Sequence, residues 1–121
     1  MSYIDGFIIA VPTAKKEAFI EHASMGDSVF TDFGAKRVVE CWADDVPDGN
    51  VTDFKKAVQA KEDESVVFSF IEWPDKETRD TAMNTMMSEG FSDDRLDPEK
   101  NPPPFDGSRL IYGGFRPIVE T

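Results

Sequence analysis

The segment 65–73 carries large apolar side chains in both registers of a strand. Phe68 and Phe70 alternate with Val67 and Ile71, so an extended chain here presents apolar groups to both faces of its sheet. A strand with this pattern is typically buried on both sides. The sequence therefore predicts a sheet that needs a cover over each of its faces.

Three other segments are predicted to be strands because they are rich in β-branched and aromatic residues. The first of them ends at Pro12, and the last contains Gly113 and Gly114, which indicate a bulge or a close backbone approach. The mixed, charged segment 51–63 is predicted to be a hairpin excursion or a short strand near the sheet edge. The three predicted strands are residues 3–11, 35–43 and 108–118.

Two segments have the apolar periodicity of helices. The first is predicted to begin with Thr13 as its N-cap and to end at Gly34 in a C′ position, and the second runs from Pro74 to Gly90. The segment 91–107 that follows is acidic and proline-rich, which is typical of a lid, an interface arm or a partly disordered connection, and its Pro102–Pro104 run is predicted to be a stiff spacer before the last strand. The apolar face of the first helix is predicted from Ala18, His22, Met25, Val29 and Phe33, with Phe19, Gly26 and Phe30 beside them, and that of the second from Ala82, Met83, Met86 and Met87.

The order of these elements is β-α-β-β-α-β, which is that of the ferredoxin-like α+β fold. A chain of 121 residues forms one such domain over residues 1–121. Both helices cover the same face of the antiparallel sheet in this fold, and no further element is predicted for the other face. We therefore expect a second copy to cover it, sheet against sheet, as a homodimer of the dimeric α/β barrel type.

Charge and composition exclude several classes of partner. The formal net charge of −11 repels nucleic-acid phosphates and anionic membranes. The single Cys41 cannot form an internal disulfide, and the first residues show no secretory signal, so a cytoplasmic location is expected. No metal site is predicted, because the chain has one histidine and its acidic turns lack the spacing of an EF-hand. The sequence contains no nucleotide-binding motif, so no cofactor is predicted either.

Glu40 is the most informative polar residue of the predicted sheet. It shares a face with Val38 and Trp42, where loss of solvent would raise the pKa of a carboxyl group. Glu72 is a second carboxylate in an apolar strand, and the two could act together in acid–base chemistry if their strands pair in register. The alternative is that each forms an ion pair with an arginine. No catalytic residue is assigned, and the candidates for a pocket or an interface are Glu40, Trp42, Arg37, Tyr3, Asp5, Glu72 and Tyr112.

Two reactive side chains are expected to be structural. His22 is predicted to be a core or half-buried residue bonded to a backbone carbonyl, and not a general base. Cys41 is predicted to be a buried thiol, because Arg37 on the same strand face lies about 13 Å away, too far to activate it. The acidic turn around Asp48 and Gly49 is assigned to turn chemistry.

Several blocks of the sequence resemble the YbaA-like family of uncharacterised bacterial proteins. The resemblance implies a ferredoxin-like dimeric α/β barrel, and it carries over no catalytic residue because the family is known as a domain of unknown function. The blocks are Tyr3-Ile4-Asp5-Gly6-Phe7, Arg37-Val38-Val39-Glu40-Cys41-Trp42, Asp44-Asp45-Val46-Pro47-Asp48-Gly49, Val51-Thr52-Asp53-Phe54, Lys61-Glu62-Asp63-Glu64, Pro104-Phe105-Asp106-Gly107 and Ile111-Tyr112-Gly113-Gly114-Phe115.

Two functional hypotheses remain open. The first is a small-molecule-binding protein or cofactor-free enzyme, with its pocket between sheet and helices or inside the barrel; this rests on analogy of fold. The alternative is a non-enzymatic homodimeric structural or regulatory module, whose polar strand residues form interface ion pairs. An enclosed pocket that holds Glu40 or Glu72 away from any arginine favours the first hypothesis.

Overall fold

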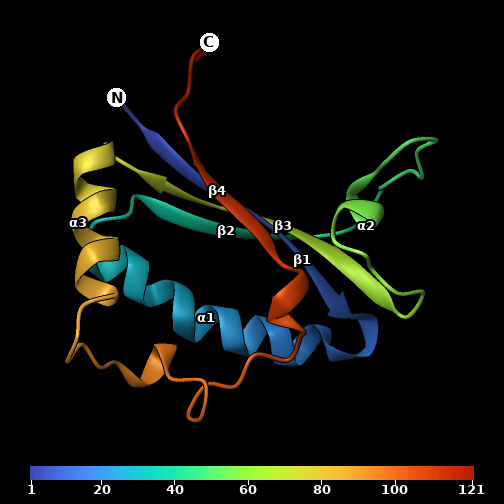
Figure 1. The fold of residues 1–121 in the computed structure, drawn as a ribbon, viewed down its shortest axis with the longest axis horizontal. Coiled ribbons are helices and arrows are strands. Elements are labelled where there is room, and N and C mark those ends of the chain that lie inside the picture. The colour runs from blue at the N-terminus through green and yellow to red at the C-terminus, as the bar shows by residue number, and fades with distance from the viewer.

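The computed structural model describes residues 1–121 and contains one four-stranded antiparallel sheet (Figure 1). The strand order is β2-β3-β1-β4, with the two longest strands in the centre. The predicted α+β class is confirmed, and this order is compatible with the ferredoxin-like type. The strands are β1 (Tyr3–Pro12), β2 (Arg37–Trp42), β3 (Glu64–Trp73) and β4 (Ile111–Phe115).

Two long helices, α1 (Lys16–Asp32) and α3 (Lys76–Met86), pack on one side of the sheet (Figure 1). A short 3-10 turn, η1 (Thr13–Lys15), precedes α1. Thr13 does not cap the helix, because its hydroxyl is hydrogen-bonded to the Ser65 hydroxyl at 2.7 Å. Gly34 follows the end of α1 with a φ of 107°, a conformation that favours glycine, so the predicted helix end is confirmed. No helix is both long enough and apolar enough to span a membrane.

The predicted apolar faces of the helices are only partly correct. α1 buries Phe19, Ala23 and Val29, whereas Ala18 and Met25 are exposed. Phe19 and Val29 of the predicted face are therefore confirmed as buried, and Ala23 is added to it, because several small and apolar residues lie side by side on this helix and periodicity alone does not choose among them. In α3, Ala82 is buried and Met83 and Met86 are half-buried, but Met87 is exposed and not a core residue.

The core under the helices has two parts. One surrounds Trp73 and Ile71 at the α3 end of the sheet, and the other surrounds Val11 and Val67 near the start of α1. Phe7 of β1 lies between them and contacts both. The middle of the helix-covered face is therefore the place where the two packed clusters meet.

The opposite face of the sheet is covered at one end by a short helix, α2 (Phe54–Ala57), whereas a hairpin excursion or a short edge strand was predicted for residues 51–63. Asp53 accepts a hydrogen bond from the Lys56 backbone N–H at 2.7 Å and so begins the helix. Val58 then packs against Ala10 and Val66. The chain thus supplies part of the cover for this face itself, contrary to our expectation.

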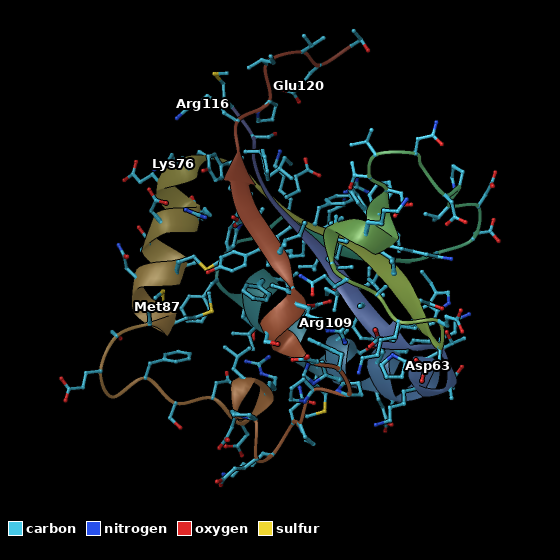
Figure 2. The ribbon with its side chains drawn as sticks, turned by 45° about the vertical axis from the view of Figure 1, so that its right-hand side comes forward. Asp63, Lys76, Met87, Arg109, Arg116 and Glu120 are labelled. Atoms are coloured by element: carbon cyan, nitrogen blue, oxygen red, sulfur yellow. The ribbon has the colours of Figure 1, made fainter.

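The remainder of that face is open. Phe68, Ile111 and Phe115 are 46%, 45% and 61% exposed there. The last strand is shorter than predicted, and the residues from Arg116 to Glu120 extend away from the sheet (Figure 2).

The segment between α3 and β4 runs alongside α1, as the orange chain of Figure 1 shows. It contains two 3-10 turns, η2 (Asp94–Leu96) and η3 (Gly107–Arg109). Arg109 ends the segment with two hydrogen bonds of 2.7 Å to the buried carboxylate of Glu64. The segment is therefore fixed to the sheet at its far end, and it closes the space beside α1.

Candidate functional site

A cavity of about 370 Å³ lies between α1, the helix-covered face of the sheet and the segment 95–105. Its wall is largely apolar, which is typical of sites for small organic ligands. The polar side chains that reach it come from β2, β3, α1 and the long segment. The main apolar lining residues are Phe7, Ile9, Phe30, Val38, Ile71 and Phe105.

Glu40 reaches the cavity because alternation along β2 turns Val38, Glu40 and Trp42 toward the helices. Its strand partner on β3 is Ser69, which is also buried and lines the cavity. From the other side, α1 places Asp27 so that its carboxyl is hydrogen-bonded to that of Glu40. Two carboxyl groups can share a hydrogen bond only when one of them carries a proton.

The environment decides which of the two carboxyls keeps that proton. Burial, together with the hydrogen bond to Asp27 and its negative charge, raises the pKa of Glu40 to about 8. Burial also raises the pKa of Asp27, but its bond to Glu40 and the nearby His22 offset part of that effect. Near neutral pH, Glu40 is therefore the acid of the pair and Asp27 the carboxylate.

One oxygen of Glu40, Oε1, is completely buried and accepts no hydrogen bond of normal length from an N–H or hydroxyl group, which leaves the contacts with Asp27 and Ser69 as the polar surroundings of this carboxyl. Buried polar atoms without partners are rare in folded proteins, and each costs about 1–3 kcal/mol. No arginine forms an ion pair with Glu40. Arg95 lines the cavity, but its guanidinium donates to Asp93, Asp32 and Ser28 at 2.8–3.0 Å.

His22 lines the same cavity and lies on α1 five residues before Asp27, about one and a half turns away. Its Nδ1 lies 3.0 Å from Oδ1 of the buried Asn101, and its ring packs edge-on to Phe105 with centroids 5.8 Å apart. The predicted bond from the His22 ring to a backbone carbonyl is therefore wrong. The arrangement brings an imidazole, a carboxylic acid and a carboxylate into one apolar cavity. Such a set can donate and accept protons.

The family model described as "Protein of unknown function (DUF1428)" matches residues 2–107. The chain belongs to this family. The uncharacterized protein YbaA of Escherichia coli strain K12 is 54% identical over 120 residues, covering 99% of each chain. Proteins of the same name from Escherichia coli O157:H7 and Shigella flexneri show the same identity and coverage. The resemblance to the YbaA-like family is thus confirmed.

In this DUF1428 protein, Tyr3 and Asp5 lie outside the cavity lining. Asp5 is buried and accepts hydrogen bonds from Trp73 Nε1 at 2.9 Å and from Arg79 at 2.8 and 3.1 Å. The Arg79 guanidinium also stacks on the Tyr3 ring, 5.2 Å from its centroid. These groups form a network of hydrogen bonds and an ion pair that joins α3 to β1.

Arg37 and Glu72 form an ion pair of 3.0 Å on the opposite face of the sheet from Glu40. The alternative prediction, that Glu72 forms an ion pair with an arginine, is therefore correct. The two carboxylates that the sequence singled out do not meet, because alternation in β2 and β3 directs Glu40 and Glu72 to different faces.

Trp42, Tyr112 and Cys41 lie outside the cavity lining. Trp42 packs against Phe19, with ring centroids 6.3 Å apart, and does not line the cavity. Tyr112 stacks on Phe7 from the edge strand and is 76% exposed. Cys41 is exposed, so the prediction of a buried thiol is wrong; β2 is an edge strand, and Cys41 faces the uncovered side of the sheet.

Sequence reasoning missed Asp27, Ser69 and Asn101, and it rejected His22. Asp27 left a usable signal, since it falls in the row of α1 that contains Ala23 and Phe30, where a charged residue is unexpected. Asn101 has no such signal in the sequence, because its position depends on where the segment between α3 and β4 packs against α1. No three His, Cys, Asp or Glu side chains are grouped in a way that could hold a metal ion.

Proposed function

We propose that this protein binds a small, largely apolar organic molecule in the cavity beside α1 and exchanges a proton with it through the ionisable groups around Glu40. The observation that carries this proposal is the buried, unpartnered Oε1 of Glu40. A polar group of a ligand would satisfy this atom. The ligand's apolar part would then lie against the aromatic and aliphatic wall.

The energetic balance of the carboxyl pair supports a functional role. A half-buried glutamic acid beside an aspartate destabilises the fold at neutral pH, and groups of this kind concentrate at functional sites. A carboxyl group with a pKa near the working pH is also suited to acid–base catalysis. The cavity volume lies at the lower end of the range for ligand pockets, about 300–1,000 Å³, which favours a small ligand.

A thermal-shift screen tests the binding proposal with small ketones, phenols and aromatic acids. We expect at least one class to stabilise the wild type, and we expect Val38→Phe, which fills the cavity from β2, to abolish that effect. Glu40→Gln should weaken binding while leaving the cavity open. The matched control is Glu72→Gln, the same substitution on the opposite face, which should bind as the wild type does. Equal stabilisation of the wild type and Val38→Phe would place the ligand elsewhere and refute the proposal.

We also propose that the open face of the sheet forms a homodimer, since a second copy would cover its exposed apolar side chains. Phe68, Ile111 and Phe115 lie on this face, and they are of the kind that form the centre of homodimer interfaces. This interface and the cavity occupy different sides of the sheet, so dimerisation and ligand binding are compatible. A cytoplasmic location and the absence of a nucleic-acid partner stay predictions from the sequence.

Light scattering tests the dimer directly. The wild type should have twice the mass of the chain, and Phe68→Glu should be monomeric with its ligand affinity unchanged. Cys41 on the same face provides a second measurement, because its reaction with a thiol reagent should slow as protein concentration rises. A monomeric wild type would contradict this proposal and leave the cavity proposal untouched.

A further inference from the structure

Asn101 fixes the hydrogen-bonding state of His22. Its Nδ2 donates to two backbone carbonyls, the His22 oxygen at 3.1 Å and the Arg95 oxygen at 2.8 Å. Both amide protons are thereby used, so the atom that faces the His22 ring is the amide oxygen. An amide oxygen only accepts hydrogen bonds, so His22 Nδ1 must carry a proton.

The assignment of Nδ1 as the protonated nitrogen leaves Nε2 as the basic nitrogen of the neutral imidazole. No protein group is hydrogen-bonded to Nε2. The ring is held from two sides, by Asn101 at Nδ1 and by the edge contact with Phe105. Because Asn101 is buried, solvent does not compete for this bond. The cavity therefore contains an oriented base as well as the acid on Glu40.

We propose that His22 is the base of this cavity, that Asn101 is its positioning residue, and that the ligand is a carbonyl compound with a proton on its α-carbon. This inference rests on the proposed small-molecule site and names the chemistry of its ligand. On binding, the Glu40 proton turns from its hydrogen bond with Asp27 to the carbonyl oxygen, which accepts it, and the α-carbon lies against His22.

The proton transfer balances without a co-reactant. His22 Nε2 takes the α-proton, and the electron pair of the broken C–H bond forms the C=C bond of an enol as the carbonyl π pair moves to oxygen. Glu40 stabilises or protonates that oxygen. Return of the proton from His22 to the same carbon restores the ketone, and its return to a carbon further along a conjugated system gives an isomer.

The charged groups around His22 are compatible with this role. Asp27 lies close enough to stabilise the imidazolium that forms after proton transfer. Glu40 faces the pair from β2. Arg95 approaches from the long segment, but its charge is neutralised by Asp32 and Asp93. The base thus has an anionic neighbour on its own helix and an acid across the cavity.

The tautomer can be measured without any ligand, because His22 is the only histidine. A long-range ¹H–¹⁵N spectrum of the labelled protein, recorded where the imidazole is neutral, should show the proton on Nδ1. Asn101→Leu should remove this preference, and Asn101→Asp, which keeps the acceptor, should retain it. A wild-type imidazole protonated on Nε2 would overturn the assignment.

The chemistry is tested by α-proton exchange in D₂O with cyclohexanone, acetophenone and phenylacetone. We expect at least one ketone to bind and to exchange faster with protein than in buffer. His22→Gln should reduce the protein-dependent rate by about 100-fold or more, whereas Glu21→Gln, on the exposed side of α1, should leave it unchanged.

Binding of a ketone without His22-dependent exchange overturns this inference while the proposed binding site stands. Binding of phenols or aromatic acids but of no ketone overturns the ligand assignment alone. Failure of every compound class to bind refutes the proposed function itself.

Discussion

Replacement of Glu40 by glutamine should make the protein more stable at neutral pH. Burial raises the pKa of Glu40 from its ordinary value of 4.5 to about 8. Below pH 4.5 the folded and unfolded chains both carry the proton, and the group costs nothing. Between pH 4.5 and 8 only the folded chain retains it, so the free energy of unfolding falls as the pH rises. Above pH 8 that loss is complete.

The magnitude follows from the size of the window. Each pH unit between 4.5 and 8 lowers the free energy of unfolding by about 1.4 kcal/mol, which gives a loss of about 3 kcal/mol at pH 7. Because the Glu40 carboxyl is not completely enclosed, we expect a loss of about 2–3 kcal/mol. Glutamine has the shape of the protonated acid and carries no proton to lose, and its amide can donate to Asp27. Glu40→Gln should therefore raise the melting temperature by roughly 6–12 °C at pH 7.

The assay is chemical denaturation of both proteins between pH 4 and 8. The two should be nearly equal at pH 4, and the difference should grow with pH. Glu72→Gln, which removes only the ion pair with Arg37, should be as stable as the wild type or less stable by up to about 1 kcal/mol. If Glu40→Gln were no more stable than the wild type at pH 8, Glu40 would not hold a proton in the fold and the reasoning would be refuted.

Two further predictions concern the scaffold. Asp5→Ala should cost about 3 kcal/mol in a urea titration, because it removes the buried partner of Arg79, which then keeps only the more exposed Asp80, and leaves Trp73 Nε1 without its acceptor; a loss below about 1 kcal/mol would show that the pair is not structural. Gly34→Ala should cost roughly 1–3 kcal/mol, since its φ is 107° and the new Cβ would lie 2.9 Å from Thr78. Gly90→Ala is the matched control, with a φ of 88° and no atom within 4 Å, and it should cost less; equal losses would assign the whole effect to the backbone.

The strands and their order along the chain could be predicted because their signals are local. Alternation in 65–73, the stop at Pro12 and the glycine at position 34 each act within a few residues. The segment 51–63 was predicted wrongly because its charged residues suit an edge strand as well as a short helix, and packing of Val58 against Ala10 decided the outcome.

The candidate site was harder to predict because it is assembled from distant parts of the chain. Glu40 could be found, since an acidic residue in an apolar strand face is visible in the sequence. Whether Asp27 and His22 reach the cavity depends on the rotation of α1 against the sheet. Asn101 reaches it only because the long segment docks beside α1, and Asn101 is 79 residues from His22 in the sequence. Such contacts are set by tertiary packing and leave little trace in local patterns.

The location of the ligand is the most direct test of the account, and methyl NMR can provide it. Ala23, Ile9 and Ile71 line the cavity, whereas Ala10 and Ile111 lie on the other face of the sheet. Titration with a compound that stabilises the protein should shift the first group of methyl signals and leave the second unchanged. Shifts confined to Ala10 and Ile111 would contradict the account, because they would place the ligand on the face that we assign to the dimer.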